Sequence, residues 1–228
     1  YFFVRDVTEG MVFGGMQTDI RAGAIKIDTG QESVKPMPSP VGPNGRRIGV
    51  YEDRLIRAAG RAQKQLGVCI NTHTDPMDYT VTNPGIEQLD VIEEEGGDPG
   101  KVILGHAFVS PKSVEQIVDI CKRGANVQVD HLGIPWRHDD SAALDESMAT
   151  MMCELAARGY LSQMTITYDR WFFNPRGPAT SDNPQLLNEK VGLGHLFESF
   201  APRLQKKGFG ARELETVLVD NPRRILAF

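Results

Sequence analysis

The segment Arg21–Ile27 reads RAGAIKI, and it is the first of five short apolar runs from which a fold can be predicted. Lys26 stands between Ile25 and Ile27 in a run of strand length, and a turn signal follows at Gly30. Burial of a lysine disfavours the ammonium, so a lysine inside a buried strand has a lowered pKa and an amine available for chemistry. The alternative is a lysine at the end of a strand, whose ammonium reaches water.

Four further runs of strand length follow, and segments with helical spacing separate them. The strands are expected at Val68–His73, Lys101–His106, Ala125–His131 and Ser162–Asp169. The helices are expected at Tyr51–Leu66, Gly85–Glu95, Pro111–Arg123, Ser141–Arg158, His195–Lys207 and Ala211–Phe228. Such alternation predicts an α/β fold with a parallel sheet, either an open doubly wound sheet or part of a (β/α)8 TIM-type barrel. No G-x-G-x-x-G or P-loop lysine motif occurs in the sequence, which disfavours the open nucleotide-binding sheet.

The composition excludes several classes of protein. The chain has 228 residues and a net charge of -5, which argues against a nucleic-acid surface. No apolar run approaches the roughly 20 residues of a membrane helix. Cys69, Cys121 and Cys153 are odd in number and lack metal-site spacing, so they are expected to be buried thiols in a reducing compartment. We therefore expect a cytoplasmic protein with no nucleic-acid and no membrane partner.

The carboxyl ends of the five predicted strands all carry side chains with site chemistry. They are Lys26, His73, His106, the pair Asp130-His131, and Asp169. In a parallel barrel these ends share one face, and that face holds the active site. Any one of these histidines alone is better explained as a structural residue, but five such ends in one chain favour a functional site. Imidazoles and carboxylates bind divalent cations such as zinc.

Several runs resemble one known family. They are IRAGAIKI around Lys26, NTHT at His73, EQLDVIEEEG at Glu87–Gly96, KVILGH at His106, VDH at Asp130-His131, and VDNPRRILAF at the C-terminus. Through them the sequence resembles the phosphotriesterase family of the amidohydrolase superfamily, which includes the phosphotriesterase-like lactonases. The resemblance covers nearly the whole chain and implies a (β/α)8 barrel with two divalent metal ions, zinc first, with cobalt and manganese as alternatives.

The resemblance also implies a role for each metal ligand. Lys26, combined with carbon dioxide as a carbamate, would be an anionic ligand that bridges the two metals. His73 and His106 would hold one metal, and Asp169 would hold the other. A hydroxide that bridges the metals would attack the substrate, as two-metal sites produce such a nucleophile at neutral pH.

The proton path and the substrate follow from the same resemblance. Asp169 would accept a proton from the hydroxide, His131 would take it onward, and Asp130 would orient His131 or line the pocket. The loops after the fourth and fifth strands carry Trp136, Arg170 and Trp171, which suit a hydrophobic lactone, carboxylic ester or phosphotriester. A homodimer is expected by the same analogy, with the apolar N-terminal segment as one candidate contact.

The sequence departs from the family pattern in three ways. Val109 stands where the phosphotriesterases have an aspartate that ends the proton relay, so the relay must end elsewhere or in water. No His-x-His pair is present to complete the second metal site. Only five strand–helix units are visible, so we expect residues 1–228 to form a single domain with the last five βα units, the first three lying upstream of Tyr1.

These observations favour a binuclear metal-dependent hydrolase acting on ester bonds. The missing His-x-His pair keeps a second hypothesis open, namely a catalytically inactive barrel homologue that binds a small ligand or a partner. Metal content separates the two, because the enzyme would hold two ions and the binding protein none. An open-sheet nucleotide enzyme is a third and weaker alternative.

Overall fold

The chain folds around a five-stranded parallel sheet whose strands follow one another in chain order. The computed structural model describes residues 1–29, 46, 48–74, 83–109, 113–134, 141–169 and 193–228. The sheet has the order β3-β4-β5-β6-β7. Its strands are β3 (Ala24–Asp28), β4 (Cys69–His73), β5 (Val102–Gly105), β6 (Asn126–Val129) and β7 (Met164–Ile166). The prediction of a parallel α/β sheet with barrel-type order is confirmed, and the chain contains five consecutive βα units.

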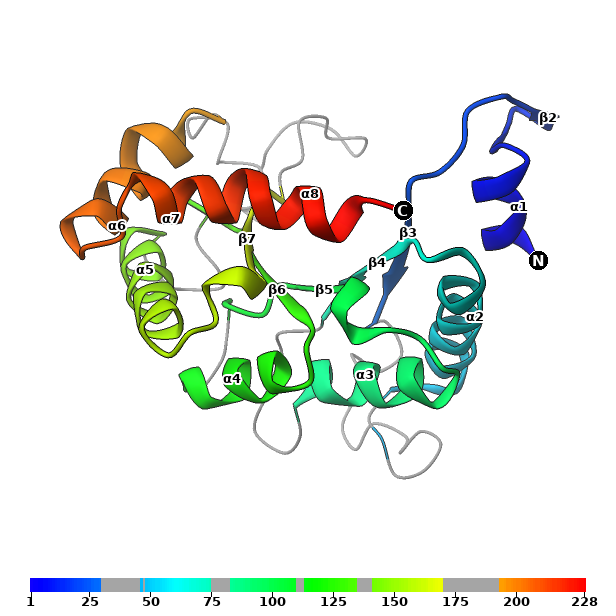
Figure 1. The fold of residues 1–228 in the computed structure, drawn as a ribbon, viewed down its shortest axis with the longest axis horizontal. Helices are drawn as coiled ribbons and strands as arrows, with labels where there is room; N and C mark the ends of the chain where they lie inside the picture. The colour runs from blue at the N-terminus through cyan, green and yellow to red at the C-terminus, as the bar shows by residue number, and fades with distance from the viewer. Residues whose placement is uncertain (30–45, 47, 75–82, 110–112, 135–140, 170–192) are drawn as a thin grey trace, which may run out of the picture.

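Four helices connect these strands and lie in an arc along one side of the sheet (Figure 1). They are α2 (Val50–Leu66), α3 (Pro84–Glu94), α4 (Val114–Lys122) and α5 (Ser141–Ala157). The expected helix starting at Pro111 begins at Val114, after Ser113, and Ser110 and Pro111 lie outside the described residues. Two single turns of 3-10 helix, η2 (Pro99–Lys101) and η3 (Leu161–Gln163), precede β5 and β7.

Successive side chains of each strand point to opposite faces of the sheet. The outer face packs against the helices, and Ile25, Ile27 and Leu104 are buried there in the main hydrophobic core. On the opposite, inner face the register sets Lys26 beside Asn71, and Asn71 beside Ile103. Side chains at paired positions of a parallel sheet point to the same face, so the inner face is the more polar one.

The sequence left two alternatives open for Lys26, a buried strand position and a side chain that reaches water, and the structure is nearer to the second. Exposed and buried residues alternate along β3, and Lys26 is one of the exposed ones. The apolar neighbours Ile25 and Ile27 do not bury it, because successive residues of a strand point to opposite faces. Lys26 therefore reaches the inner face, while the isoleucines anchor the strand to the helices.

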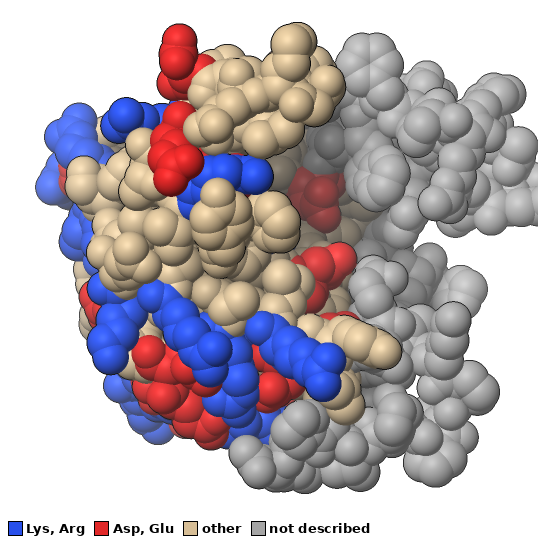
Figure 2. Space-filling model, turned by 90° about the vertical axis from the view of Figure 1, so that its right-hand side faces the viewer, with Lys and Arg blue, Asp and Glu red and all other residues tan. Residues whose placement is uncertain are grey.

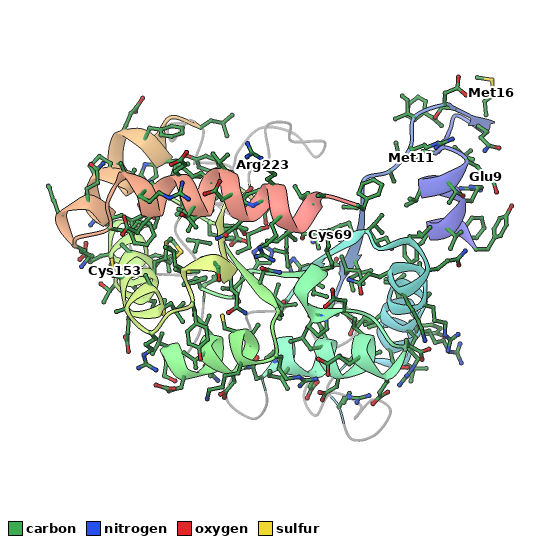
Figure 3. The ribbon with its side chains drawn as sticks, in the orientation of Figure 1. Glu9, Met11, Met16, Cys69, Cys153 and Arg223 are labelled. Carbon is green, nitrogen blue, oxygen red and sulfur yellow. The ribbon has the colours of Figure 1, made fainter. Side chains whose placement is uncertain are left out.

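The N-terminal segment forms a small unit that stands apart from the sheet (Figure 1). It consists of α1 (Phe2–Thr8) and a hairpin of β1 (Val12–Phe13) and β2 (Met16–Gln17). Gly14 and Gly15 both have positive φ, as the two central residues of a tight hairpin turn require. Met11 and Met16 lie on this unit, and both are exposed (Figure 3).

The C-terminal segment, residues 193–228, returns across the molecule and ends beside β3 (Figure 1). Its helical segments are η5 (Leu196–Phe200), α6 (Ala201–Lys206), α7 (Ala211–Glu215), η6 (Thr216–Asp220) and α8 (Asn221–Leu226). Ile225 of α8 packs with Cys69 and Ile103, and this cluster fills part of the inner face. Within the described residues, no helix combines the length and the apolar character that crossing a bilayer requires.

The three cysteines are unpaired, and Figure 3 shows Cys69 within the sheet and Cys153 on α5. Cys69 and Cys121 are buried, as expected, whereas Cys153 is partly exposed. Burial raises the pKa of the Cys69 thiol, and that of Cys121, to about 12, so neither is a reactive thiolate at neutral pH.

Candidate metal centre

Three histidines gather at the carboxyl ends of β4, β5 and β6: His73 is the last residue of β4, and His106 and His131 follow β5 and β6. Nε2 of His106 lies 2.8 Å from Nδ1 of His73. The ring centroids of His106 and His73 are 4.3 Å apart, and those of His106 and His131 are 4.8 Å apart. His106 is therefore the central member, with one imidazole on each side.

Two of these histidines depart from the strand alternation. His106 comes two residues after the outward-facing Leu104, and His131 comes two residues after the outward-facing Val129. Continued strand geometry would turn both rings toward the helices. Instead His106 has φ 61° and His131 has φ 50°, and no other non-glycine residue in the described part of the chain has a positive φ. This left-handed conformation costs roughly 1–3 kcal/mol per residue and is concentrated at functional sites.

Asp169 joins the histidines from the far end of the sheet. Its Oδ2 lies 3.6 Å from Nε2 of His106 and 3.6 Å from Nε2 of His131. One donor atom from each of these three residues falls within 4.8 Å of the others. Two imidazole nitrogens and a carboxylate oxygen are a donor set that suits zinc and similar divalent cations.

Asp130 is fully buried and holds His106 at two points. Its Oδ2 accepts a hydrogen bond of 2.9 Å from the backbone N–H of His106. Its Oδ1 lies 3.1 Å from Nδ1 of the same imidazole. A carboxylate on Nδ1 leaves Nε2 as the donor atom that faces Asp169 and His73, which is the usual carboxylate–histidine–metal arrangement. The donor set and its orientation thus fit a bound divalent metal.

These contacts connect Asp130 with a different histidine from the one expected. The sequence suggested that Asp130 orients His131 or lines the pocket, whereas its hydrogen bond and close ion contact are with His106. Gln128 donates to Asp130 at 3.1 Å, and Asn71 donates to Gln128 at 3.2 Å. The motif analysis missed Asn71 and Gln128, although their polar side chains at alternate strand positions were a signal for the inner face.

The charges around the site shift several pKa values. Burial, reinforced by the neighbouring His106, lowers the pKa of His73. Burial acts in the same direction on His106, but the hydrogen bond to Asp130 and the charge of that carboxylate outweigh it and raise the pKa of His106. The neighbouring imidazole of His131 lowers the pKa of Asp169. Asp169 is therefore a carboxylate, and His73 a neutral imidazole, at neutral pH.

Lys26 belongs to the same electrostatic neighbourhood. Partial burial of its ammonium lowers its pKa, although the charges of Asp28, Asp169 and Asp130 act in the opposite direction. Asp28, which the motif analysis also missed, has its Oδ1 3.8 Å from Nδ1 of His73. A lysine with a lowered pKa has more of the neutral amine that reacts with carbon dioxide.

Trp136, Arg170 and Trp171 fall outside the described residues. Val109 is buried and closes a turn by donating its N–H to the carbonyl oxygen of His106 at 3.1 Å. Its apolar side chain offers no proton acceptor.

Comparisons with known proteins point to one family. A model described as the phosphotriesterase family matches residues 2–226. The chain is 26% identical over 223 residues to a phosphotriesterase homology protein of Mycobacterium tuberculosis, covering 98% of this chain and 59% of that protein. It is 26% identical over 227 residues to an aryldialkylphosphatase of Saccharolobus solfataricus, covering 99% of this chain and 63% of that protein.

Solved structures of members of this family share the fold of this chain. The phosphotriesterase structure from Mycobacterium tuberculosis superposes with a TM-score of 0.73 at 25% identity, over 99% of this chain and 60% of that one. The phosphotriesterase homology protein of Escherichia coli, solved with phosphate in its active site, superposes with a TM-score of 0.73 at 25% identity, over 98% of this chain and 64% of that one. The chain thus spans less than two thirds of the length of these relatives.

Proposed function

Since the chain belongs to the phosphotriesterase family, we propose that it is part of a metal-dependent hydrolase with a binuclear centre. Lys26 as a carbamate, His73, His106 and Asp169 are the proposed ligands from this chain, and zinc is the first candidate, with cobalt and manganese as alternatives. The observation that carries the proposal is that Nε2 of His106 lies 2.8 Å from Nδ1 of His73 and 3.6 Å from Oδ2 of Asp169, which brings three of the proposed ligands together.

The bound metal pair would supply a hydroxide nucleophile at neutral pH and polarise the bond under attack. Residues of this chain would accept the proton and pass it on. Oδ2 of Asp169 accepts it, and Nε2 of His131, 3.6 Å away, receives it from Asp169. Asp130 contributes by holding the ring of His106, whose backbone N–H it binds at 2.9 Å.

The proposed substrate is a hydrophobic lactone or carboxylic ester, with phosphotriesters as a second substrate class. Family membership supports a hydrolase, and the name of the Saccharolobus relative, aryldialkylphosphatase, supports the phosphotriester class, whereas the lactone and the carboxylic ester rest on the resemblance described above. Trp136, Arg170 and Trp171 are proposed to contact the substrate, because aromatic walls with an arginine suit such esters. The homodimer expected from the sequence remains a prediction, and sedimentation of the purified protein checks it.

The test is hydrolysis of a γ-lactone, an aryl ester and an aryl dialkyl phosphate, with zinc, cobalt or manganese added and then removed by a chelator. We expect activity to follow metal content. Rates that are indifferent to the chelator would contradict the metal mechanism, and a protein that binds no metal would favour the non-catalytic binding protein.

Lys26→Ala tests the bridging ligand. We expect it to lose bound metal and at least about a hundredfold in rate, because loss of outer-shell partners alone costs 10–100-fold. The matched control is Lys122→Ala, an exposed lysine of α4 that pairs with Asp119 at 3.1 Å. A Lys26→Ala protein that keeps both its metal and its rate would show that the bridge assignment is wrong.

A further inference from the structure

A second buried aspartate connects the turn that carries His131 with the C-terminal segment of the chain. Asp145 is the fifth residue of α5 and is 1% exposed. Its Oδ1 accepts a hydrogen bond of 2.9 Å from the backbone N–H of Gly133. Its Oδ2 lies 2.7 Å from Nε2 of His195. One carboxylate thereby joins segments that are 12 and 50 residues away in the sequence.

The bond to Gly133 acts on a strained turn. The carbonyl oxygen of His131 accepts from the N–H of Ile134 at 3.0 Å, so residues 131–134 form a turn. Gly133 has φ 68° in this turn, and His131, its first residue, has φ 50°. A left-handed non-glycine residue persists only where its surroundings over-determine it. Asp145 supplies one such restraint, as Asp130 does for His106.

The partner residue His195 belongs to a segment that is also tied to Asp169. The hydroxyl of Tyr168, next to Asp169 in the sequence, donates to the carbonyl oxygen of Leu193 at 2.7 Å. The same hydroxyl accepts from the N–H of Leu196 at 2.5 Å. The segment 193–196 is thus bound from one side by Tyr168 and from the other by Asp145.

We propose that Asp145 is a positioning residue, which together with His195 and Tyr168 fixes the imidazole of His131 relative to the carboxylate of Asp169. The inference rests on the proposed function, in which these two groups exchange a proton. Two partners 3.6 Å apart tolerate little displacement, since proton transfer requires them to approach hydrogen-bond distance. Asp145 touches neither group, so it acts only through the turn and the segment that it binds.

Variants of Asp145 separate positioning from general stability. Asp145→Ala removes both bonds, Asp145→Asn keeps an oxygen for Gly133 but loses the charge beside His195, and His195→Phe removes only the second bond. The matched control is Glu146→Gln, the next residue of α5, whose carboxylate binds Arg203 at 2.6 Å and also pairs with Lys207. Glu146→Gln weakens the contact between α5 and α6 and leaves the turn at residues 131–134 unchanged.

The first readout is independent of activity and of metal. Ring resonances of the histidines are recorded in the metal-free protein, with His131 assigned from the spectrum of His131→Asn. We expect Asp145→Ala to shift or broaden the resonance of His131, Asp145→Asn and His195→Phe to do so less, and Glu146→Gln to leave it unchanged. Should Asp145→Ala fail to fold, the two milder variants still carry the test.

The second readout is kinetic. Asp145→Ala should lower kcat by about ten- to a hundredfold with KM within about twofold, since small misplacements of reacting groups have effects of this size. A lowered melting temperature with an unchanged His131 resonance and an unchanged kcat would overturn the proposal. If the parent protein hydrolyses nothing but the resonance moves as expected, the proposed function fails while the positioning of His131 stands.

Discussion

At the scale of single residues, buried carboxylates set the orientation of the imidazoles. Oδ2 of Asp130 binds the backbone of His106, and its Oδ1 faces the ring of the same residue. Burial would raise the pKa of Asp130, but the hydrogen bond and the charge of His106 outweigh it and hold that pKa below its usual value. Asp130 is therefore an anion that both restrains a left-handed backbone and selects which ring nitrogen is free.

Asp130→Asn should weaken metal binding by about 10–100-fold, as expected for the loss of a carboxylate behind a ligating histidine. The amide can still accept from the N–H of His106, so the backbone restraint survives better than the ring orientation. Competition titration with zinc measures the affinity. Asp98→Asn is the control, because Asp98 lies before β5, away from the site. Equal affinities in the two variants would contradict the assigned role of Asp130.

Gly105 allows β4 and β5 to approach closely beside the site. A Cβ added at Gly105 would lie 2.6 Å from the carbonyl oxygen of Thr72, which is backbone and cannot swing away. We expect Gly105→Ala to lower the free energy of unfolding by about 1–3 kcal/mol, the usual cost of overpacking. Gly23→Ala should change it by less than about 0.5 kcal/mol, because its nearest neighbour is a side-chain atom of Phe228 at 3.7 Å. Urea unfolding of both variants compares them.

At the scale of elements, α2 and α3 are joined by a network of ion pairs. Arg57 binds Asp53 of its own helix at 2.8 Å, Glu94 at 2.7 Å and Glu95 at 2.8 Å. Arg46 also binds Glu94, at 2.5 Å. Figure 2 shows basic and acidic side chains interleaved on this face of the molecule. A network supports a helix pair better than isolated surface pairs do, because several charges share one geometry.

Glu94→Gln tests this network through its pH dependence. Hydrogen bonds from Arg46 and Arg57 lower the pKa of Glu94 to about 2. A lowered folded-state pKa stabilises the protein above the unfolded value of about 4.3 and loses that effect as the pH falls toward 2. Because the side chain is 40% exposed, solvent screening should limit the loss in Glu94→Gln at pH 7 to about 1 kcal/mol or less.

The difference in unfolding free energy between Glu94→Gln and the parent should shrink as the pH falls from 5 toward 2, and also in high salt. Asp119→Asn, which breaks the exposed pair with Lys122, is the control and should show no measurable difference at either pH. A difference for Glu94→Gln that persists at low pH would mean that packing, not charge, explains it.

At the scale of the whole molecule, the C-terminal helix is tied to the amino ends of the strands. Nζ of Lys101, just before β5, donates to the carbonyl oxygens of Arg224 and Ile225 at 3.2 Å each, and also to that of Ala227. These are carbonyls that the end of α8 leaves without helical partners. Arg224 in turn donates to Asn126 of β6 at 2.9 Å and to the carbonyl oxygen of Ser162 at 2.7 Å. The hydrogen bonds of Lys101 thus join residues that are more than 120 positions apart in the sequence.

Lys101→Met should lower the free energy of unfolding by about 1–3 kcal/mol, because carbonyls at the end of α8 lose a charged donor. Hydrogen exchange of the α8 amides should accelerate more than exchange in α3. Lys122→Met, on the exposed side of α4, is the control and should leave α8 unchanged. Unaltered exchange in α8 after Lys101→Met would show that packing of Ile225 alone holds the helix.

Much of this architecture could be predicted from local pattern. Alternating apolar runs and helical spacing predicted five strands and the helices between them, because secondary structure follows from neighbours a few residues apart. The same reasoning predicted which residues stand at the strand ends. It predicted strands that were too long, however, because His106, His131 and Asp169 lie beyond the ends of β5, β6 and β7. A strand ends where its hydrogen-bonded pairing with the neighbouring strand and its backbone angles change. Neither can be recognised in one short segment of sequence.

Residue order thus sufficed for the parallel sheet and for naming the polar residues at the strand ends. Folding alone decided that His106 and His131 turn inward, that Asp130 holds His106, and that Asp145 reaches Gly133 and His195. The physical reason is distance along the chain. Left-handed backbone and buried carboxylates are unfavourable by themselves, and they become stable only through partners that other segments bring to them.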